Sequence, residues 1–373
     1  MDNLFKKVWN YFFSKKSPSV LGIDVGSSSI KLVQLKKKGG KAVLETYGEI
    51  SLGPYAGFEI GRSTNLSADK VAEALRDLIG EANVTTKSCG LSIPVSSSLI
   101  TFIKLPQTAE KQLETVIPME ARKYIPVPIS EVSLNWWVVP EEQDERSEFQ
   151  GNEGEKMEQG INVFLAVIHN DAIDRNAKVV KAANLESSFF EIELFSSIRS
   201  SLDQSLRPVM VFDMGASSTK LYVVERGVLR NSHIINKGSQ DISMAVSKSM
   251  GISFEEAERL KREYGIASGG ENKDLTEIAS LTLEYIFSES SRVLLNYQKK
   301  HNKNVSRVVL TGGGVNLKGF KDYAQTIFQA ECVIANPFEK VEFPAFLDDV
   351  LKTAGPEFAV AIGVALRKLQ EME

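Results

Sequence analysis

Two segments, nearly half the chain apart, repeat one arrangement of an acid, a glycine, hydroxyl residues and a lysine. They read Leu21-Gly-Ile-Asp-Val-Gly-Ser-Ser-Ser-Ile-Lys-Leu and Val211-Phe-Asp-Met-Gly-Ala-Ser-Ser-Thr-Lys-Leu. Each lies between two apolar runs, which predicts a strand, a tight turn and a second strand. The N–H groups and hydroxyls of such a turn can surround phosphate oxygens, and the acid at the strand end can hold a hydrated Mg²⁺. The repeat therefore predicts a duplicated architecture that binds phosphate.

The duplication carries more weight than either copy alone, because single Asp-x-Gly turns are common in hairpins. Asp24 aligns with Asp213, and Gly26 aligns with Gly215. The chain contains no Gly-x-x-x-x-Gly-Lys-Ser/Thr segment, so a P-loop is excluded as the phosphate-binding element.

A third glycine-rich segment, Thr311-Gly-Gly-Gly-Val-Asn-Leu, follows the apolar run Val308-Val-Leu. A backbone without side chains can come close to a ligand there. Taken alone, the segment is better explained as a flexible connection between a strand and a helix. As the third such turn in a duplicated scaffold, it favours ligand binding.

The composition is that of an ordinary globular protein, and its 373 residues are enough for two or more domains. A net charge of −4 gives no electrostatic case for binding nucleic acid. Cys89 and Cys332 lie far apart among apolar or small residues, which predicts buried free thiols. No apolar run approaches the roughly 20 residues that span a bilayer. Lys15 and Lys16 interrupt the N-terminal aromatic stretch before a signal peptide could form, so we expect a cytoplasmic protein.

The hydrophobic pattern divides the chain into an N-terminal segment and three larger parts. Residues 18–98 with 189–206 form a first half, residues 207–373 form a second half with a C-terminal helix, and residues 99–188 form an inserted α+β subdomain. Within the insertion, the acidic tract 141–160 has no apolar periodicity and is either a loop or a partner contact.

Residues 1–17 form the N-terminal segment, a short basic amphipathic stretch. Its apolar side chains share one helical face: Leu4, Phe5, Val8, Trp9 and Phe12. Such a helix either lies on an anionic membrane surface or packs on the protein body or a partner. The sequence leaves both alternatives open.

The three turns, in this order, resemble the phosphate-1, phosphate-2 and adenosine motifs of the actin/Hsp70/hexokinase ATPase superfamily. Ala257-Glu-Arg-Leu-Lys is similar to the helix with which bacterial members contact ribose and adenine. Within the insertion, Leu105-Pro and Glu120-Ala-Arg-Lys-Tyr-Ile-Pro-Val-Pro resemble the PilM family of type IV pilus assembly proteins. The resemblance covers residues 18 to 370. It implies an α/β fold, a duplicated actin-like (ribonuclease H-like) ATPase fold with an inserted small α+β subdomain.

The resemblance also implies ATP and Mg²⁺ as ligands and assigns site residues. Asp24 and Asp213 would help hold Mg²⁺, mostly through waters. The phosphates would contact Gly26, Ser27, Ser28, Ser29, Lys31, Gly215, Ala216, Ser217 and Ser218. The adenosine would lie along Gly313, Gly314, Val315 and Asn316, with Glu258 and Lys261 at the ribose or base.

Hydrolysis in this superfamily needs a polar residue that orients the attacking water, near the helix that joins the halves. Glu193 is the candidate and Glu191 the second choice, in the segment Ile192-Glu-Leu-Phe-Ser. A solvated carboxylate at a helix start explains Glu193 equally well, and the proline usual beside it is absent. We therefore expect ATP binding with weak or absent hydrolysis.

The resemblance further implies a partner. In the PilM family, a groove beside the inserted subdomain binds the cytoplasmic N-terminal peptide of the inner-membrane protein PilN, which places the protein at the inner membrane as a peripheral component. Trp136 and Trp137 alternate on one strand, so one should face the subdomain core and the other should face outward. Tyr124, Ile125 and Val127 are further groove candidates or helix-end core.

Two other functions fit the same fold. An FtsA-like, membrane-associated, filament-forming ATPase that self-associates is the alternative, with residues 1–17 as the membrane anchor. FtsA carries its amphipathic helix at the other end of the chain, which argues against this reading. A sugar kinase would need a sugar-binding constellation between the halves, and the sequence offers none.

Overall fold

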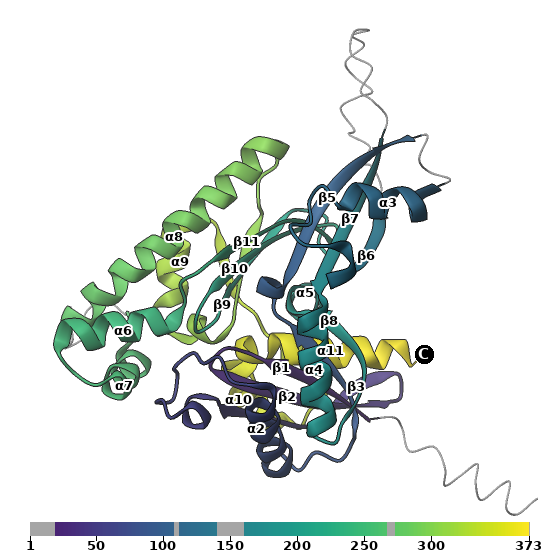
Figure 1. Ribbon diagram of the computed structural model, residues 1–373. Helices are drawn as coiled ribbons and strands as arrows, with labels where there is room; N and C mark the ends of the chain where they lie inside the picture. Colours follow the sequence, from purple (N-terminus) through teal and green to yellow (C-terminus); the bar gives the residue numbers. More distant parts are fainter. Residues whose placement is uncertain (1–18, 108–111, 140–159, 267–272, 373) are drawn as a thin grey trace, which may run out of the picture. The chain divides into compact units, whose positions relative to one another are not determined.

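The computed structural model describes residues 19–107, 112–139, 160–266 and 273–372 (Figure 1). The chain divides into two compact units. Unit 1 comprises the described parts of Met1–Ser92 and Asn176–Glu373, and unit 2 comprises those of Ile93–Arg175. Within these ranges no helix combines the length and the apolar character needed to cross a membrane.

Two sheets with the same strand arrangement form the framework of unit 1. The first has the order β3-β2-β1-β4-β8, with the bounds Lys41–Ser51, Ser29–Lys38, Ser19–Val25, Ser88–Ile93 and Glu186–Ile192. The second has the order β11-β10-β9-β12-β13, with the bounds Val228–Ile235, Thr219–Glu225, Val209–Met214, Arg307–Thr311 and Glu331–Ile334. In each sheet the three strands that come first in the chain form an antiparallel meander: β1, β2 and β3 in the first sheet, and β9, β10 and β11 in the second. The next strand in the chain pairs in parallel with the first strand of that meander, β4 with β1 and β12 with β9. The sequence repeat is thus a structural duplication.

Helices cover both faces of the first sheet and the outer face of the second. In the first sheet, Leu21 and Ile23 pack against α2 (Ala68–Glu81) and α4 (Asn170–Ala182). The opposite face packs against α10 (Asp348–Ala354) and α11 (Ala359–Glu371). The outer face of the second sheet packs against α6, α7, α8 and α9, which span Ser239–Met250, Phe254–Tyr264, Lys273–His301 and Phe320–Phe328.

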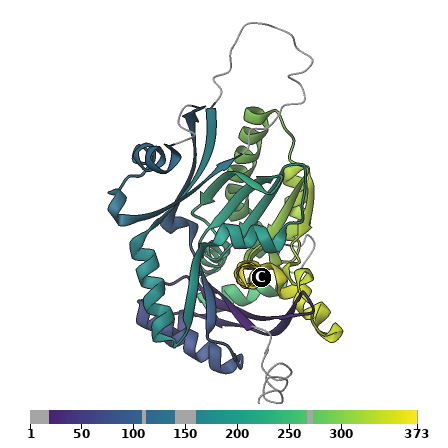
Figure 2. The same ribbon diagram turned by 90° about the vertical axis from the view of Figure 1, so that its right-hand side faces the viewer.

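The space between the two sheets holds α11 and α5 (Glu193–Ser201), and Figures 1 and 2 both show α11 there. The backbones approach closely. A Cβ on Gly22 would lie 2.0 Å from the Ala361 carbonyl oxygen, and a Cβ on Gly363 would lie 2.0 Å from the Ser196 carbonyl oxygen. Glycine is required at both positions because any side chain would push the helices away from the sheet or from each other.

Unit 2 is a three-stranded antiparallel sheet, β5-β7-β6, with the bounds Ser98–Pro106, Gly160–His169 and Val132–Val139. Helix α3 (Leu113–Ala121) packs on one face, and Trp136 belongs to that core. Trp137 points to the other face, stacks on Phe164 at 4.5 Å between ring centroids, and is 42% exposed. The predicted alternation of the two tryptophans is confirmed.

The bounds of unit 2 differ from the expected insertion, 99–188. The C-terminal half of α4 buries Val179 and Val180 in the core of the first sheet, and β8 is a strand of that sheet. Residues 176–188 therefore belong to unit 1. The sequence predicts a helix and a strand in this region. The hydrophobic periodicity of these residues does not show which of the two cores they join.

Candidate functional site

The two predicted turns have the same backbone geometry. In the first, the Gly26 N–H donates to the Ser29 carbonyl at 3.0 Å, and in the second the Gly215 N–H donates to the Ser218 carbonyl at 2.9 Å. A Cβ on either glycine would come within 3.1 to 3.2 Å of the same carbonyl oxygen. Both turns are thus closed so tightly that glycine is favoured at the corner.

Strand alternation aims the charged residues of both turns into the space between the sheets. In β1, Val20 and Gly22 face the α11 layer, so Asp24 faces it too. Asp24 pairs directly with Lys31 in the β1–β2 register, and Asp213 pairs with Lys220 in the β9–β10 register. Each turn therefore places one carboxylate and one ammonium side by side on the inner face of its sheet.

The two turns lie next to each other. The Ser217 hydroxyl donates to the Ser27 hydroxyl oxygen at 3.0 Å. The second turn is tied to the start of α6, because the Ser239 and Gln240 N–H groups donate to the Gly215 and Ala216 carbonyls at 2.9 Å. The structure thus brings together the two segments that the sequence placed nearly half the chain apart.

The lysines of the two turns have different partners. Lys31 Nζ lies 2.8 Å from Glu49 Oε1 and donates to the Ser29 hydroxyl at 2.7 Å. Lys220 Nζ lies 2.6 Å from Glu193 Oε2, at the first residue of α5. Glu193, the sequence candidate for orienting water, is therefore bound by the largely buried Lys220 ammonium.

Burial governs the protonation of both turn carboxylates. It raises the pKa of Asp213 to about 6; Lys220 opposes this rise, while Glu193 and Asp24 add to it. Burial and the neighbouring Glu193 also raise the pKa of Asp24, although the Ser92 hydroxyl donates to its Oδ1 at 2.7 Å. These carboxylates have lost water without gaining full compensation from the protein, which is the condition that a bound cation relieves.

The fit to a hydrated Mg²⁺ is supported by one more buried group. Tyr222 lies two residues after Lys220 on the same face of β10, is fully buried, and its hydroxyl has no hydrogen-bond partner among the described residues. Across the same residues, no three His, Cys, Asp or Glu side chains gather as direct metal ligands. Asp24 and Asp213 would therefore hold Mg²⁺ mainly through water molecules. Mg²⁺ is suited to this because it usually keeps several waters of its hydration shell.

The third turn lies against the second. Gly312 has a φ of +84°, and a Cβ there would lie 2.5 Å from Asp213 Oδ1. A Cβ on Gly314 would lie 2.5 Å from the Met214 side chain. The next residues form η5 (Gly313–Asn316), where Val315 is buried and Asn316 donates to Glu357 Oε1 at 2.8 Å.

Glu357 is a site residue that the sequence did not reveal. It lies in η8 (Gly355–Phe358), just before α11. Burial raises the pKa of Glu357 although Lys31 opposes the rise, and Glu49 raises it further. The carboxylate thus lies between the third turn and the lysine of the first turn. A polar residue after Gly355-Pro was the only sequence signal for it.

Glu258 and Lys261 lie on α7 as a bonded pair. Glu258 Oε2 accepts from Lys261 Nζ at 2.6 Å and from the Ser243 hydroxyl at 2.5 Å, and its Oε1 accepts from Arg262 at 2.7 Å. Lys261 Nζ also donates to the Ser239 carbonyl at 3.1 Å, which links α7 to the start of α6 beside the second turn.

Glu191, the second candidate for orienting water, is engaged elsewhere. Its oxygens accept from Arg199 at 2.8 Å and from Arg367 at 2.9 Å, and the Ser196 hydroxyl also donates to it. Although burial opposes this, Arg199 lowers the pKa of Glu191. Glu191 therefore joins β8, α5 and α11 and is not free for a water.

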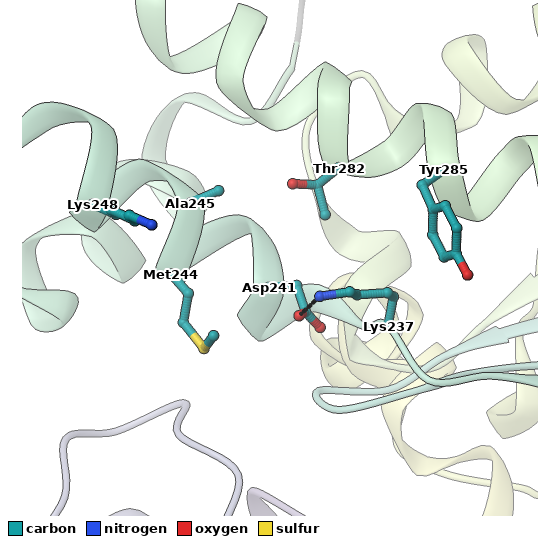
Figure 3. A pocket seen from close by; sticks show the side chains of 7 residues that line it. All are labelled: Lys237, Asp241, Met244, Ala245, Lys248, Thr282 and Tyr285. Atoms are coloured by element: carbon teal, nitrogen blue, oxygen red, sulfur yellow. Dashed lines mark hydrogen bonds and ion pairs between the residues drawn. The ribbon is translucent and has the colours of Figure 1, made fainter.

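A cavity of about 320 Å³ lies between α6 and α8, and its lining reaches the start of α6 beside the second turn. Figure 3 shows its lining, which comprises Lys237, Asp241, Met244, Ala245, Lys248, Thr282 and Tyr285. None of these residues was predicted as part of a site. The cavity begins next to Gly238, where α6 starts.

Comparison with known proteins identifies the family. A model of the family described as type IV pilus assembly protein PilM matches residues 22–369. The chain belongs to the PilM family. Among solved structures, a PilM-PilN type IV pilus biogenesis complex covers 94% of this chain and 98% of its own, with a TM-score of 0.76 and 24% identity.

Two further proteins are similar to the chain. Cell division protein FtsA of Neisseria meningitidis serogroup B is 24% identical over 380 residues, covering 92% of this chain and 88% of FtsA. MreB5 of Spiroplasma citri, solved with AMPPNP bound, has a TM-score of 0.54 at 12% identity, covering 96% of this chain and 98% of its own. The duplicated actin-like ATPase fold expected from the sequence is confirmed.

Proposed function

We propose that this PilM-family chain is an ATP-binding actin-like scaffold of type IV pilus assembly, peripheral at the cytoplasmic face of the inner membrane. The observation that carries the proposal is the pair of adjoining turns with matched geometry, each presenting a carboxylate and a lysine to one space. Such a pair can bind a triphosphate and a hydrated Mg²⁺ between its two turns.

Each predicted residue has a role in this proposal. The N–H groups and hydroxyls of residues 26–29 and 215–218 would bind the phosphates, with Lys31 beside them. Asp24 and Asp213 would hold the waters of Mg²⁺. The glycine-rich third turn leaves room for adenosine, and Glu258 with Lys261 would meet the ribose or base.

Slow turnover follows from the environment of Glu193. Lys220 Nζ lies 2.6 Å from its carboxylate, and both side chains are largely buried. A carboxylate paired in this way is a weak acceptor for the proton of an attacking water. We therefore infer a nucleotide-dependent scaffold rather than a fast ATPase, with Glu193 as the remaining catalytic candidate.

The partner in this proposal is a PilN-type inner-membrane protein, bound through its cytoplasmic N-terminal peptide. Unit 2 offers exposed apolar side chains that could anchor a peptide: Met119, Tyr124, Trp137 and Val138. Ile125 is buried and Val127 packs on the core of unit 2, so Tyr124 is the one exposed member of that trio. Residues 1–17 and the acidic tract at 141–160 lie outside the described residues (the structure resumes at Gly160), and membrane contact through residues 1–17 stays part of the proposal.

Calorimetry with MgATP tests the nucleotide site. Asp24→Ala and Asp213→Ala should each weaken binding more than tenfold, or about 1.4 kcal/mol. Asp322→Ala, an exposed acid on α9, is the matched control and should bind like the parent. Unchanged affinity in both turn variants would show that the site is misassigned.

A synthetic peptide of the cognate PilN cytoplasmic N-terminus tests the partner surface. Trp137→Ala should weaken its binding about tenfold or more, since a tryptophan anchor commonly contributes above 1 kcal/mol. Leu206→Ala, at an 80% exposed leucine of unit 1, is the control. Deleting residues 1–17 should leave peptide binding intact and reduce sedimentation with anionic vesicles.

The FtsA-like alternative, a membrane-associated filament-forming ATPase, is favoured by the 24% identity to FtsA along most of the chain. It predicts ATP-dependent pelleting of the protein in the absence of PilN peptide. A scaffold without filaments would stay in the supernatant under the same conditions.

A further inference from the structure

The loop between η1 (Gly53–Ala56) and α2 crosses from the first half of unit 1 to the second. We call residues 58–64 the strap. It begins at a tight turn, where the Phe58 N–H donates to the Gly53 carbonyl at 2.9 Å. Figure 1 shows this segment beside α7, where Gly61 approaches Glu258.

The strap is tied to both phosphate turns. The Thr64 N–H donates to the Ser27 carbonyl of the first turn at 2.8 Å. The Ser63 N–H donates to Gln240 Oε1 at 2.9 Å, and the Gln240 N–H donates in turn to the Ala216 carbonyl of the second turn. Displacement of the strap therefore alters contacts of both turns at once.

The middle of the strap lies on α7. Gly61 has a φ of +91°, and a Cβ there would lie 2.9 Å from the Glu258 carboxyl carbon. The Arg62 guanidinium lies 4.8 Å from the centre of the Phe254 ring, a cation–π contact at the start of α7. Lys261, Arg262 and Ser243 hydrogen-bond to the Glu258 carboxylate from other sides. The strap backbone thus covers the remaining side of this carboxylate.

We propose that the strap is a gate for the nucleotide site, held closed by its contacts with Gln240, Phe254 and Glu258. The inference rests on the proposed function, in which Glu258 meets the ribose or base of ATP. Strap and ribose cannot both occupy the surface of that carboxylate, so the strap must swing off α7 for a nucleotide to enter. Its ties to Ser27 and Gln240 couple this movement to the two phosphate turns.

Stopped-flow association of a fluorescent N-methylanthraniloyl ATP with Mg²⁺, on the full chain, measures the gate. Arg62→Ala removes the cation–π contact, and Gln240→Ala removes the acceptor of the Ser63 N–H. The double variant should associate about tenfold faster, because both contacts that hold the closed strap are lost. Ile60→Ala, at a 56% exposed strap residue, is the control and should keep the parent rate.

A covalent lock gives the opposite test. Ser63→Cys with Gln240→Cys, joined by a short bismaleimide, should abolish association. The native Cys89 and Cys332 are buried, and burial raises the pKa of Cys89 to about 12 and of Cys332 to about 11, so they should not react.

The outcomes separate the two proposals. A locked protein that binds at the parent rate, or a double variant with an unchanged rate, overturns the gate while nucleotide binding stands. A parent protein that binds no fluorescent ATP at all overturns the nucleotide site, and the gate with it.

Discussion

The first and second turns share a backbone geometry but differ in which side chains bind their lysines. Lys31 pairs with Glu49, its direct neighbour across β2 and β3. The corresponding neighbour of Lys220 across β10 and β11 is Ile234, which offers no charge. Lys220 therefore reaches out of its sheet to Glu193 on α5. Duplication kept the turn geometry, whereas the ionic partners diverged and tied only the second turn to the helix between the sheets.

The carboxylates of the turns differ in a parallel way. Asp24 accepts a hydrogen bond from Ser92, on the strand beside it. Asp213 lies instead against the Gly312 backbone, where any side chain would collide with it. The second turn is thus the one in contact with both the third turn and α5.

The largest expected effect comes from removing Lys220, with removal of Lys31 as the comparison. Lys220→Met should lower the free energy of unfolding by about 3 to 5 kcal/mol, because it removes the ammonium that lies 2.6 Å from the largely buried Glu193 carboxylate. Lys31→Met should lower it by about 1 kcal/mol or less, since the Glu49 side chain is 37% exposed and can rehydrate. Urea denaturation measures both. Equal losses would contradict the asymmetry, and Lys220→Met with Glu193→Leu should regain most of the loss.

The second prediction concerns pH. With its pKa raised to about 6 from 3.8, Asp213 binds more protons folded than unfolded between about pH 4 and 6. The favourable contribution of Asp213 to the free energy of unfolding is therefore complete below about pH 4, and it is lost as the pH rises through 6. Asp213→Asn should raise the free energy of unfolding at pH 7, without Mg²⁺ or nucleotide, by up to about 3 kcal/mol.

Urea denaturation of parent and Asp213→Asn from pH 4.5 to 8 measures this effect. The gain from the substitution should grow with pH and level off above about pH 7. Asp24→Asn should also stabilise, because the pKa of Asp24 is likewise raised by burial and by Glu193. A difference between parent and variant that does not change with pH would refute the assignment to Asp213.

The smallest effect tests the contact between the turns. Ser27→Ala and Ser217→Ala should each lower the free energy of unfolding by about 0.5 to 1.5 kcal/mol. The double variant should lose less than the sum of the two, because both substitutions remove the same hydrogen bond. Ser28→Ala, a neighbouring hydroxyl in the first turn, is the control. Additive losses in the double-mutant cycle would mean that the two turns do not support each other.

The fold was predictable because its signals are local and repeated. An apolar run, a small-residue turn and a second run specify a hairpin wherever they occur, and two copies specify two similar sheets. The partner of Lys31 was not predictable in the same way. A register shift between Gln34 and Leu35 moves the β2–β3 pairing by one residue, and without it Lys31 would lie opposite Gly48. A bulge of this kind leaves no clear mark on the residue pattern.

The residue pattern alone determines the turns, the alternation that aims Asp24 and Asp213 inward, and the family to which the chain belongs. These depend on neighbours in the chain and on the two-residue period of a strand. Only the tertiary structure decides that Glu193 is bound by Lys220, that Glu357 lies beside the third turn and that the strap covers Glu258. Those contacts join residues far apart in the sequence, so they exist only once the sheets and helices have packed.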